Sequence, residues 1–147
     1  MLREDCMPDV RKPTHDVALA LVFREARWLV AQRHADAHLG GLWEFPGGKR
    51  SPQEAPIAAA IRELHEETGV AAVPLRVLPE LLCEYADRTV RLTPVLCRWL
   101  SGEPQPLGCA TCGWVTVDEL LRLEMPAVNA GLVRAALTAR AALDGNQ

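Results

Sequence analysis

Three glutamates, Glu63, Glu66 and Glu67, stand close together near the middle of the sequence. Their spacing of three and four residues places them side by side on consecutive turns of a helix. At about 6 Å and an effective dielectric constant near 20, each like-charged pair repels by roughly 2 to 3 kcal/mol. Screening lowers this repulsion on a solvated face, whereas a hard divalent cation needs several carboxylate oxygens held together. The three residues alone leave both interpretations open.

A helix that carries these glutamates has clear candidate boundaries. Proline is tolerated at the first helical position but removes a hydrogen bond deeper inside, which favours a start at Pro56 over a start at Pro52. Gly69 supplies a left-handed stop after Thr68. Glu54 then remains in the loop ahead of the helix.

The expected helix is amphipathic. At about 100° per residue, Ile57, Ile61 and Leu64 form a narrow apolar stripe. The glutamates cluster on a face centred roughly 130° away. Arg62 lies next to this acidic face and can pair with the carboxylate of Glu54, which would tie the preceding loop to the helix.

Positions 48–70 read GKRSPQEAPIAAAIRELHEETGV. This segment resembles the signature of the Nudix hydrolases, G-x5-E-x7-R-E-U-x-E-E-x-G-U, in which U is a bulky aliphatic residue. All nine specified positions are filled, by Gly48, Glu54, Arg62, Glu63, Leu64, Glu66, Glu67, Gly69 and Val70. A wider similarity to the MutT-like branch of this superfamily covers nearly the whole chain after residue 15, through 35–38, 44–49, 87–88, Trp114 and 126–129.

The resemblance implies an α/β fold of the Nudix type, a mixed β-sheet sandwiched between helices. It also implies hydrolysis, dependent on Mg²⁺ or Mn²⁺, of a nucleoside diphosphate linked to another group; in the MutT-like branch a nucleoside triphosphate gives the monophosphate and pyrophosphate. The metal ligands that it implies are Glu63, Glu66, Glu67 and the backbone carbonyl of Gly47. The catalytic set includes the same glutamates, with Arg62 and Glu54 bracing the loop against the helix.

A further set of residues matches positions that contact substrate in MutT-like enzymes: Arg33, His38, Phe45, Tyr85, Asp87, Arg88 and Asn129. Arg33 and His38 are expected near phosphates and sugar, and Phe45 near the base, although His38 also suits a polar loop and Phe45 a core position. Tyr85, Asp87 and Arg88 could rim the base pocket, but Asp is also common in a type I turn. Asn129 matches the asparagine that reads an oxidised purine with one planar amide. It also suits a helix N-cap, and it could do both.

One departure from the family pattern concerns the general base. MutT-like enzymes commonly place a glutamate in the loop before the tryptophan that Trp114 matches, but residues 107–114 contain no carboxylate. Glu103 is the nearest acidic residue upstream. Either Glu63 or Glu66 deprotonates the attacking water, or the metal alone activates it.

The remaining elements follow from the pattern of apolar and turn residues. Strands are predicted at 16–23, 28–33, 76–84 and 89–100, with a turn at 87–88 and no regular element at 45–48. Residues 101–108 are predicted to form a loop. Thr116 and Glu119 form a capping box that opens a short helix through Leu123. A last helix is predicted at 129–143, with Leu132 and Ala136 on one face.

Composition limits the class of protein. The chain has 147 residues, 49% hydrophobic and 24% charged, with a formal net charge of −3. These values predict a single globular domain at 14–147 behind a flexible leader at 1–13. The charge does not favour polymeric nucleic acid, and the longest apolar run, 17–23, is too short to span a membrane. We expect a cytoplasmic monomer or weak homodimer that binds a nucleotide.

The five scattered cysteines do not predict a disulfide framework. Cys109 and Cys112 form the only C-x-x-C pair, and we expect ordinary reduced thiols in or beside a loop. A metal or thiol sensor built on this pair is an alternative function.

The favoured substrate is 8-oxo-dGTP, in an enzyme that cleanses the nucleotide pool and so serves DNA repair. One alternative is a Nudix pyrophosphohydrolase that acts on CTP or a modified dCTP. Another is a non-catalytic Nudix-like domain that recognises oxidised DNA, although such domains usually lose signature glutamates and this chain keeps them all.

Overall fold

The computed structural model describes residues 12–145, so that most of the predicted leader at 1–13 lies outside the described residues. The strands are β1 (Thr14–Arg24), β2 (Arg27–Gln32), β3 (Trp43–Glu44), β4 (Gly47–Lys49), β5 (Ala71–Val77), β6 (Leu81–Glu84), β7 (Thr89–Ser101) and β8 (Thr111–Thr116). The helices are α2 (Pro56–Thr68), α3 (Val117–Arg122) and α4 (Asn129–Gly145).

The strands form one mixed sheet. Its main path runs β3-β2-β1-β7-β5, while β4 pairs with β1, β6 with β7 and β8 with β2. The long central pair β1 and β7 is parallel, from Thr14 opposite Thr89 to Phe23 opposite Arg98, and the other pairs are antiparallel. Such a long parallel pair is buried when helices cover both faces of the sheet.

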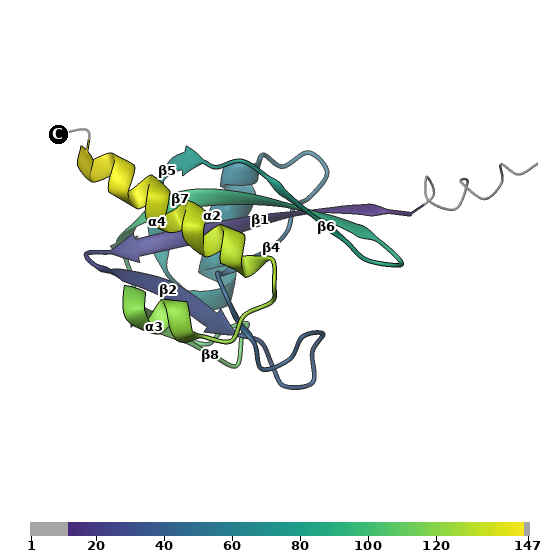
Figure 1. Ribbon diagram of the computed structural model, residues 1–147, viewed down its shortest axis with the longest axis horizontal. Coiled ribbons are helices and arrows are strands. Elements are labelled where there is room, and N and C mark those ends of the chain that lie inside the picture. The colour runs from purple at the N-terminus through teal and green to yellow at the C-terminus, as the bar shows by residue number, and fades with distance from the viewer. Residues whose placement is uncertain (1–11, 146–147) are drawn as a thin grey trace, which may run out of the picture.

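Alternate residues of β1 supply two separate cores, because successive side chains of a strand point to opposite faces. Leu19 and Leu21 pack with α3 and α4, whereas Ala18 and Ala20 pack with α2. In Figure 1, α4 crosses the near face of the sheet and α2 lies behind it. The predicted α/β class, a mixed sheet between helical layers, is therefore confirmed.

The predicted boundaries of α2 are confirmed at both ends. Pro56 occupies the first helical turn, and Gly69 follows with φ of 77°, donating its N–H to the carbonyl of His65. The predicted apolar stripe is only partly right. Leu64 is fully buried, but Ile57 is 40% exposed and small alanines at 59 and 60 face the sheet instead. Alanines at the contact let the helix lie close to the sheet.

Several strand predictions need correction, and the short strand β3 falls where no strand was predicted. Residues 45–48 were predicted to lack a regular element, but Gly47 and Gly48 belong to the short strand β4, because β1 offers its free edge there. The single strand predicted at 76–84 is two strands, β5 and β6, separated at 78–80, where Pro79 cannot donate a ladder hydrogen bond. Strand β8 was not predicted at all; its residues are half-buried and show no clear alternation.

The C-terminal helices agree with their sequence signals. The Thr116 hydroxyl accepts from the Glu119 N–H at 3.2 Å, and the Glu119 carboxylate accepts from the Thr116 N–H at 2.8 Å, which confirms the capping box of α3. Helix α4 begins at Asn129 as predicted and runs two residues further than residue 143. Within the described part of the chain, no helix has the length and apolar character needed to cross a membrane.

Candidate active site

Arg62 organises the start of the acidic face of α2. Its guanidinium holds Glu54 with two hydrogen bonds, Nε to Oε2 at 2.8 Å and Nη2 to Oε1 at 2.9 Å. The same group donates to Glu63 at 3.1 Å, to Glu66 at 3.1 Å and to the Lys49 carbonyl at 3.1 Å. One planar fork thus fixes the loop ahead of α2 to the helix, which is the arrangement expected for Arg62 and Glu54.

Glu63 lies directly against β4. A Cβ added at Gly48 would collide with the Glu63 carboxylate, so a side chain at this position would displace that carboxylate. The neighbouring Gly47 faces Ala18 and Leu19 of β1 just as closely. These two glycines let β4 pass between β1 and the acidic face of α2.

Glu67 is the most perturbed carboxyl group of this face. Burial, together with the negative charges of Glu44 and Glu63, raises its pKa to about 8. Its buried Oε1 accepts no hydrogen bond from any described residue. A buried acceptor without a partner lowers stability by about 1–3 kcal/mol. A proton or a cation on this oxygen would remove that penalty.

Glu44 is a candidate site residue that the sequence did not single out. It lies on β3, and burial raises its pKa although Arg33 opposes the shift. Arg33 Nε donates to its carboxylate at 3.0 Å, while Arg33 Nη1 donates to the His38 carbonyl at 2.9 Å. The only sequence signal was its place just before the Phe-Pro-Gly-Gly turn. Its effect on the pKa of Glu67 shows that the two carboxyl groups lie near one another.

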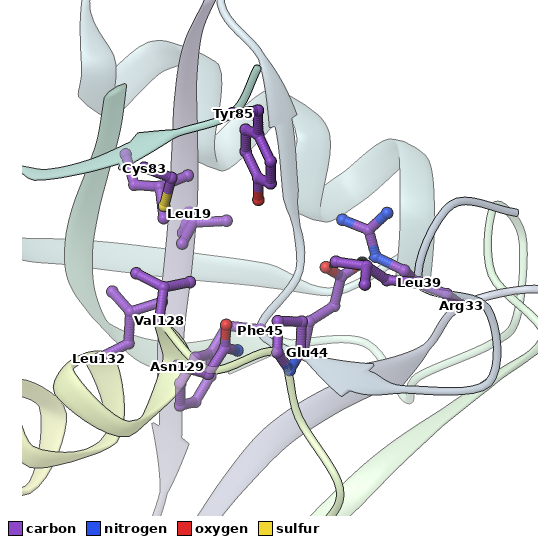
Figure 2. Close-up of a pocket in the computed structure, with 12 residues that line it drawn as sticks. Leu19, Arg33, Leu39, Glu44, Phe45, Cys83, Tyr85, Val128, Asn129 and Leu132 are labelled. Atoms are coloured by element: carbon purple, nitrogen blue, oxygen red, sulfur yellow. Dashed lines mark hydrogen bonds and ion pairs between the residues drawn. The ribbon is translucent and has the colours of Figure 1, made fainter. Parts of the chain in front are cut away.

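A cavity opens beside Glu44. Four of the seven residues predicted to bind substrate line it, namely Arg33, Phe45, Tyr85 and Asn129. In Figure 2 the Tyr85 hydroxyl and the Asn129 amide point into the cavity from opposite sides, above and beside Phe45. Its remaining walls are largely apolar, which suits the flat face of a base.

The other three predicted residues lie outside this lining. The His38 ring contacts Tyr85 edge-on at 6.1 Å between centroids, and the Arg88 guanidinium lies over the Tyr85 ring at 4.6 Å from its centroid. Asp87 pairs with Arg88 at 3.0 Å in an exposed turn. His38 and Arg88 thus contact Tyr85, which lines the cavity.

Asn129 is 95% buried at the first turn of α4. Its backbone N–H donates to the Pro126 carbonyl at 2.9 Å. The structure records no hydrogen bond between its side-chain amide and another described residue, so the capping role finds no support and both ends of the amide remain available to a ligand.

The donors along α2 suit a hard divalent cation, because they are carboxylate oxygens that lie near the backbone of Gly47. Within residues 12–145, however, no three His, Cys, Asp or Glu side chains already converge as a ligand set. In the structure the carboxylates of Glu63 and Glu66 are instead paired with Arg62. The Glu67 oxygen that accepts no hydrogen bond is a further donor of the same kind. The donor chemistry fits a divalent cation once Arg62 releases the carboxylates of Glu63 and Glu66.

Comparisons with known proteins show the family of this chain. The family model described as NUDIX domain matches residues 13–136. The chain belongs to the Nudix hydrolase family. It is 35% identical over 83 residues to the 8-oxo-dGTP diphosphatase of Proteus vulgaris, covering 56% of this chain and 74% of that protein. It is 31% identical over 127 residues to the CTP pyrophosphohydrolase of Escherichia coli, covering 86% of this chain and 94% of that protein.

The fold of this Nudix hydrolase is also that of a solved relative. The solution structure of the Escherichia coli ORF135 protein matches it with a TM-score of 0.77 and 29% identity, covering 90% of this chain and 95% of that one. The predicted membership, fold and enzyme class are thereby confirmed. Nudix hydrolases act on nucleotide substrates and generally use a divalent metal ion.

This Nudix hydrolase departs from the MutT-like pattern where a loop glutamate was expected. The loop instead packs its backbone onto the end of α2, where the N–H groups of Leu107 and Gly108 donate to the Glu67 carbonyl at 3.1 and 3.0 Å. Glu103, the nearest upstream carboxylate, is bound to Arg24 at 3.0 Å, on another part of the sheet. The loop at 107–114 therefore packs against Glu67 and contributes no carboxylate.

Proposed function

We propose that this Nudix hydrolase cleaves a nucleoside triphosphate to the monophosphate and pyrophosphate, with 8-oxo-dGTP as its preferred substrate. The observation that carries the proposal is the acidic face of α2, where Gly48 admits the Glu63 carboxylate and Glu67 keeps a buried oxygen without a hydrogen bond. A solvated acidic face has no need of either feature, whereas a cation site uses both.

In this proposal Glu63, Glu66 and Glu67 hold Mg²⁺ or Mn²⁺ together with the Gly47 carbonyl. Bound divalent cations would polarise the phosphoryl oxygens and acidify the attacking water. Arg62 has a positioning role: it releases Glu63 and Glu66 toward the cations while its two bonds to Glu54 keep the loop fixed. With no carboxylate in the 107–114 loop, the proton of the attacking water passes to Glu63 or Glu66.

The cavity beside Glu44 is the proposed base site. Phe45 supplies an apolar wall, and the Asn129 amide supplies one acceptor and two donor hydrogens on one plane. An oxidised purine presents a donor and an acceptor side by side on its edge, which one amide can read. Arg33, on the same wall, is placed to bind phosphate when it leaves Glu44.

A second candidate substrate is CTP. It is favoured by the relative named a CTP pyrophosphohydrolase, which the chain matches over 94% of that protein's length. The amide of Asn129 could equally read the edge of a cytosine, so the two candidates differ in the base that fits the cavity and share the chemistry along α2.

A substrate screen tests the proposal. Pyrophosphate release is measured with Mg²⁺ or Mn²⁺ for 8-oxo-dGTP, dGTP, CTP, dCTP and 5-methyl-dCTP. We expect the highest kcat/KM for 8-oxo-dGTP. A clear preference for CTP would replace the proposed substrate, and the absence of pyrophosphate release from all five nucleotides would overturn the proposed reaction.

A further inference from the structure

A lysine that precedes the sheet binds the hairpin that carries Tyr85. Lys12 lies in the predicted leader, just before β1 begins at Thr14, and its side chain is 23% exposed. Its Nζ donates to the Glu84 carboxylate at 3.0 Å and to the backbone carbonyl of Tyr85 at 3.1 Å. Lys12 is therefore in direct contact with a residue that lines the cavity beside Glu44.

The hairpin formed by β6 and β7 has little support of its own near this point. Strand β6 has four residues and, among the described strands, pairs only with β7. Leu82, in the middle of β6, is 58% exposed. Figure 1 shows the tip of the hairpin extending away from α2 and α4, with the start of β1 beside it. Because a short two-stranded hairpin is only marginally stable by itself, the position of its tip depends on contacts from other segments.

The backbone of Tyr85 is held on both sides. Its N–H donates to the Arg88 carbonyl at 2.8 Å, within the hairpin, and its carbonyl accepts from Lys12. The Thr89 hydroxyl donates to the Glu84 carboxylate at 2.8 Å, so this carboxylate joins β7 to Lys12. Of these contacts, those from Lys12 are the ones that come from outside the hairpin.

We propose that Lys12 is a positioning residue for base recognition, which holds the backbone of Tyr85 so that its ring stays at the cavity opposite Asn129. In Figure 2 the Tyr85 hydroxyl points into the cavity from the side opposite the Asn129 amide. The effect on substrate rests on the proposed function, whereas the effect on the position of Tyr85 does not. Lys12 acts through Tyr85 and is not a catalytic residue.

Loss of Lys12 should affect the base site more than the fold. The Glu84 side chain is 62% exposed, and ion pairs with exposed groups add little to stability. Without Lys12 the Tyr85 carbonyl can bind water, but its ring is no longer held in one place before the base arrives. A binding residue that must be ordered during binding lowers affinity. The effect should fall on KM, because the cavity is separate from the carboxylates of α2 that are proposed to hold the cations.

Three variants test this role by steady-state kinetics of pyrophosphate release from 8-oxo-dGTP. Lys12→Met removes the donors, Lys12→Arg keeps a charged donor, and Arg122→Met removes one positive charge from the exposed end of α3 as the matched control. We expect Lys12→Met to raise KM by about five- to tenfold, the effect of leaving one side chain unfixed, with kcat within about twofold of the wild type. Lys12→Arg should restore most of the affinity, and Arg122→Met should match the wild type. Equal changes in Lys12→Met and Arg122→Met would mean that only the net charge matters, which overturns the proposal.

A double-mutant cycle tests whether Lys12 acts through Tyr85. Tyr85→Ala should itself raise KM, and adding Lys12→Met to Tyr85→Ala should raise it no further, because residues that act through one another are not additive. If Lys12→Met raises KM by the same factor with and without the Tyr85 ring, Lys12 acts elsewhere and the proposal is wrong.

A spectroscopic measurement separates this proposal from the proposed function. Tyr85 is the only tyrosine of the chain, so NMR of protein labelled with ¹³C-tyrosine shows ring signals from this residue alone. Without nucleotide, we expect Lys12→Met to move these signals toward those of an unstructured tyrosine, and Lys12→Arg and Arg122→Met to leave them near the wild type. Unchanged signals in Lys12→Met would overturn the positioning role, and changed signals with an unchanged KM would overturn its link to base recognition. If the wild type hydrolyses no nucleotide, the proposed function fails, and the spectra still decide whether Lys12 positions Tyr85.

Discussion

Two carboxyl groups near α2 show how single residues are tuned in opposite directions. Hydrogen bonds from Arg62 lower the pKa of Glu54 to about 2, so this group stays ionised and keeps its ion pair with Arg62. Burial and neighbouring negative charges raise the pKa of Glu67 to about 8, so this group favours a proton or a cation. The first environment suits a positioning role, and the second suits a ligand that is charged only when a metal compensates it.

The pKa of Glu67 makes the metal-free protein sensitive to pH. The folded pKa of about 8 exceeds the ordinary value of 4.5, so the folded state holds the extra proton between these values and stability falls as pH rises through this window. Glu67→Gln removes this loss of stability at high pH, because an amide does not titrate. In the presence of a chelator, we expect Glu67→Gln to exceed the wild type in free energy of unfolding by about 1–3 kcal/mol at pH 9 and by little at pH 5.

Urea denaturation at the two pH values measures this difference. The matched variant is Glu66→Gln, which removes the same charge from an exposed position and should differ from the wild type by no more than about 1 kcal/mol at either pH. An equal effect of pH on all three proteins would show that Glu67 is not a buried, perturbed carboxyl group.

The Asn129 amide is predicted to set base preference. Asn129→Ala should lower the ratio of kcat/KM for 8-oxo-dGTP over dGTP by about tenfold or more, because a buried site built to hydrogen-bond one base discriminates through those bonds. Hydrolysis of dGTP itself should change little. Asn129→Asp keeps an acceptor but loses both donor hydrogens, so it tests which half of the amide reads the base. An unchanged ratio in both variants would remove Asn129 from base recognition.

At the scale of elements, β4 and α2 form one unit that depends on the absence of a side chain at Gly48. Gly48→Ala must push the Glu63 carboxylate away from β4. We expect a loss of kcat/KM of about a hundredfold from this displacement, with the fold retained as judged by circular dichroism.

Gly113 provides the matched control for this steric prediction. It lies on β8, where an added Cβ would meet nothing within 4 Å. Gly113→Ala should therefore hydrolyse nucleotide at the wild-type rate. Equal losses in the two variants would mean that the contact between Gly48 and Glu63 has no special importance.

Helical elements were predicted better than the short strands, and the reason is physical. Helix boundaries depend on local signals, such as Pro56 and Gly69 for α2 and the capping box for α3, which act within a few residues. The strands β4 and β8 exist because β1 and β2 present edges to them, and these partners are distant in sequence. Ile57 was misplaced because periodicity alone does not show that small alanines face the sheet.

At the scale of the whole molecule, the candidate site joins the two faces of the sheet. Helix α2 brings the acidic face from one layer, and the first turn of α4 brings Asn129 from the other. Between them Glu44, on β3, lines the cavity and also acts on the pKa of Glu67. In the proposed function, a triphosphate places its base in this cavity and its phosphates along α2.

This arrangement explains which site residues could be predicted. The signature residues are contiguous in sequence and lie on one helix and its loop, so a linear pattern was enough. The cavity is assembled from segments that are far apart in the sequence. Arg33, Phe45, Tyr85 and Asn129 line it, whereas His38 and Arg88 contact Tyr85 and Asp87 pairs with Arg88. Glu44 was missed because its burial and its pairing with Arg33 arise only in the folded chain.

The most direct test is a calorimetric titration of the protein with Mn²⁺ in the presence of a non-hydrolysable nucleoside triphosphate analogue. The comparison is the wild type against the double variant Glu63→Gln/Glu67→Gln. We predict that the wild type binds Mn²⁺ and that the variant, although folded, binds it at least about tenfold more weakly, since two carboxylate ligands are lost. Equal affinity in both proteins would contradict the claim that the acidic face of α2 holds the divalent ions.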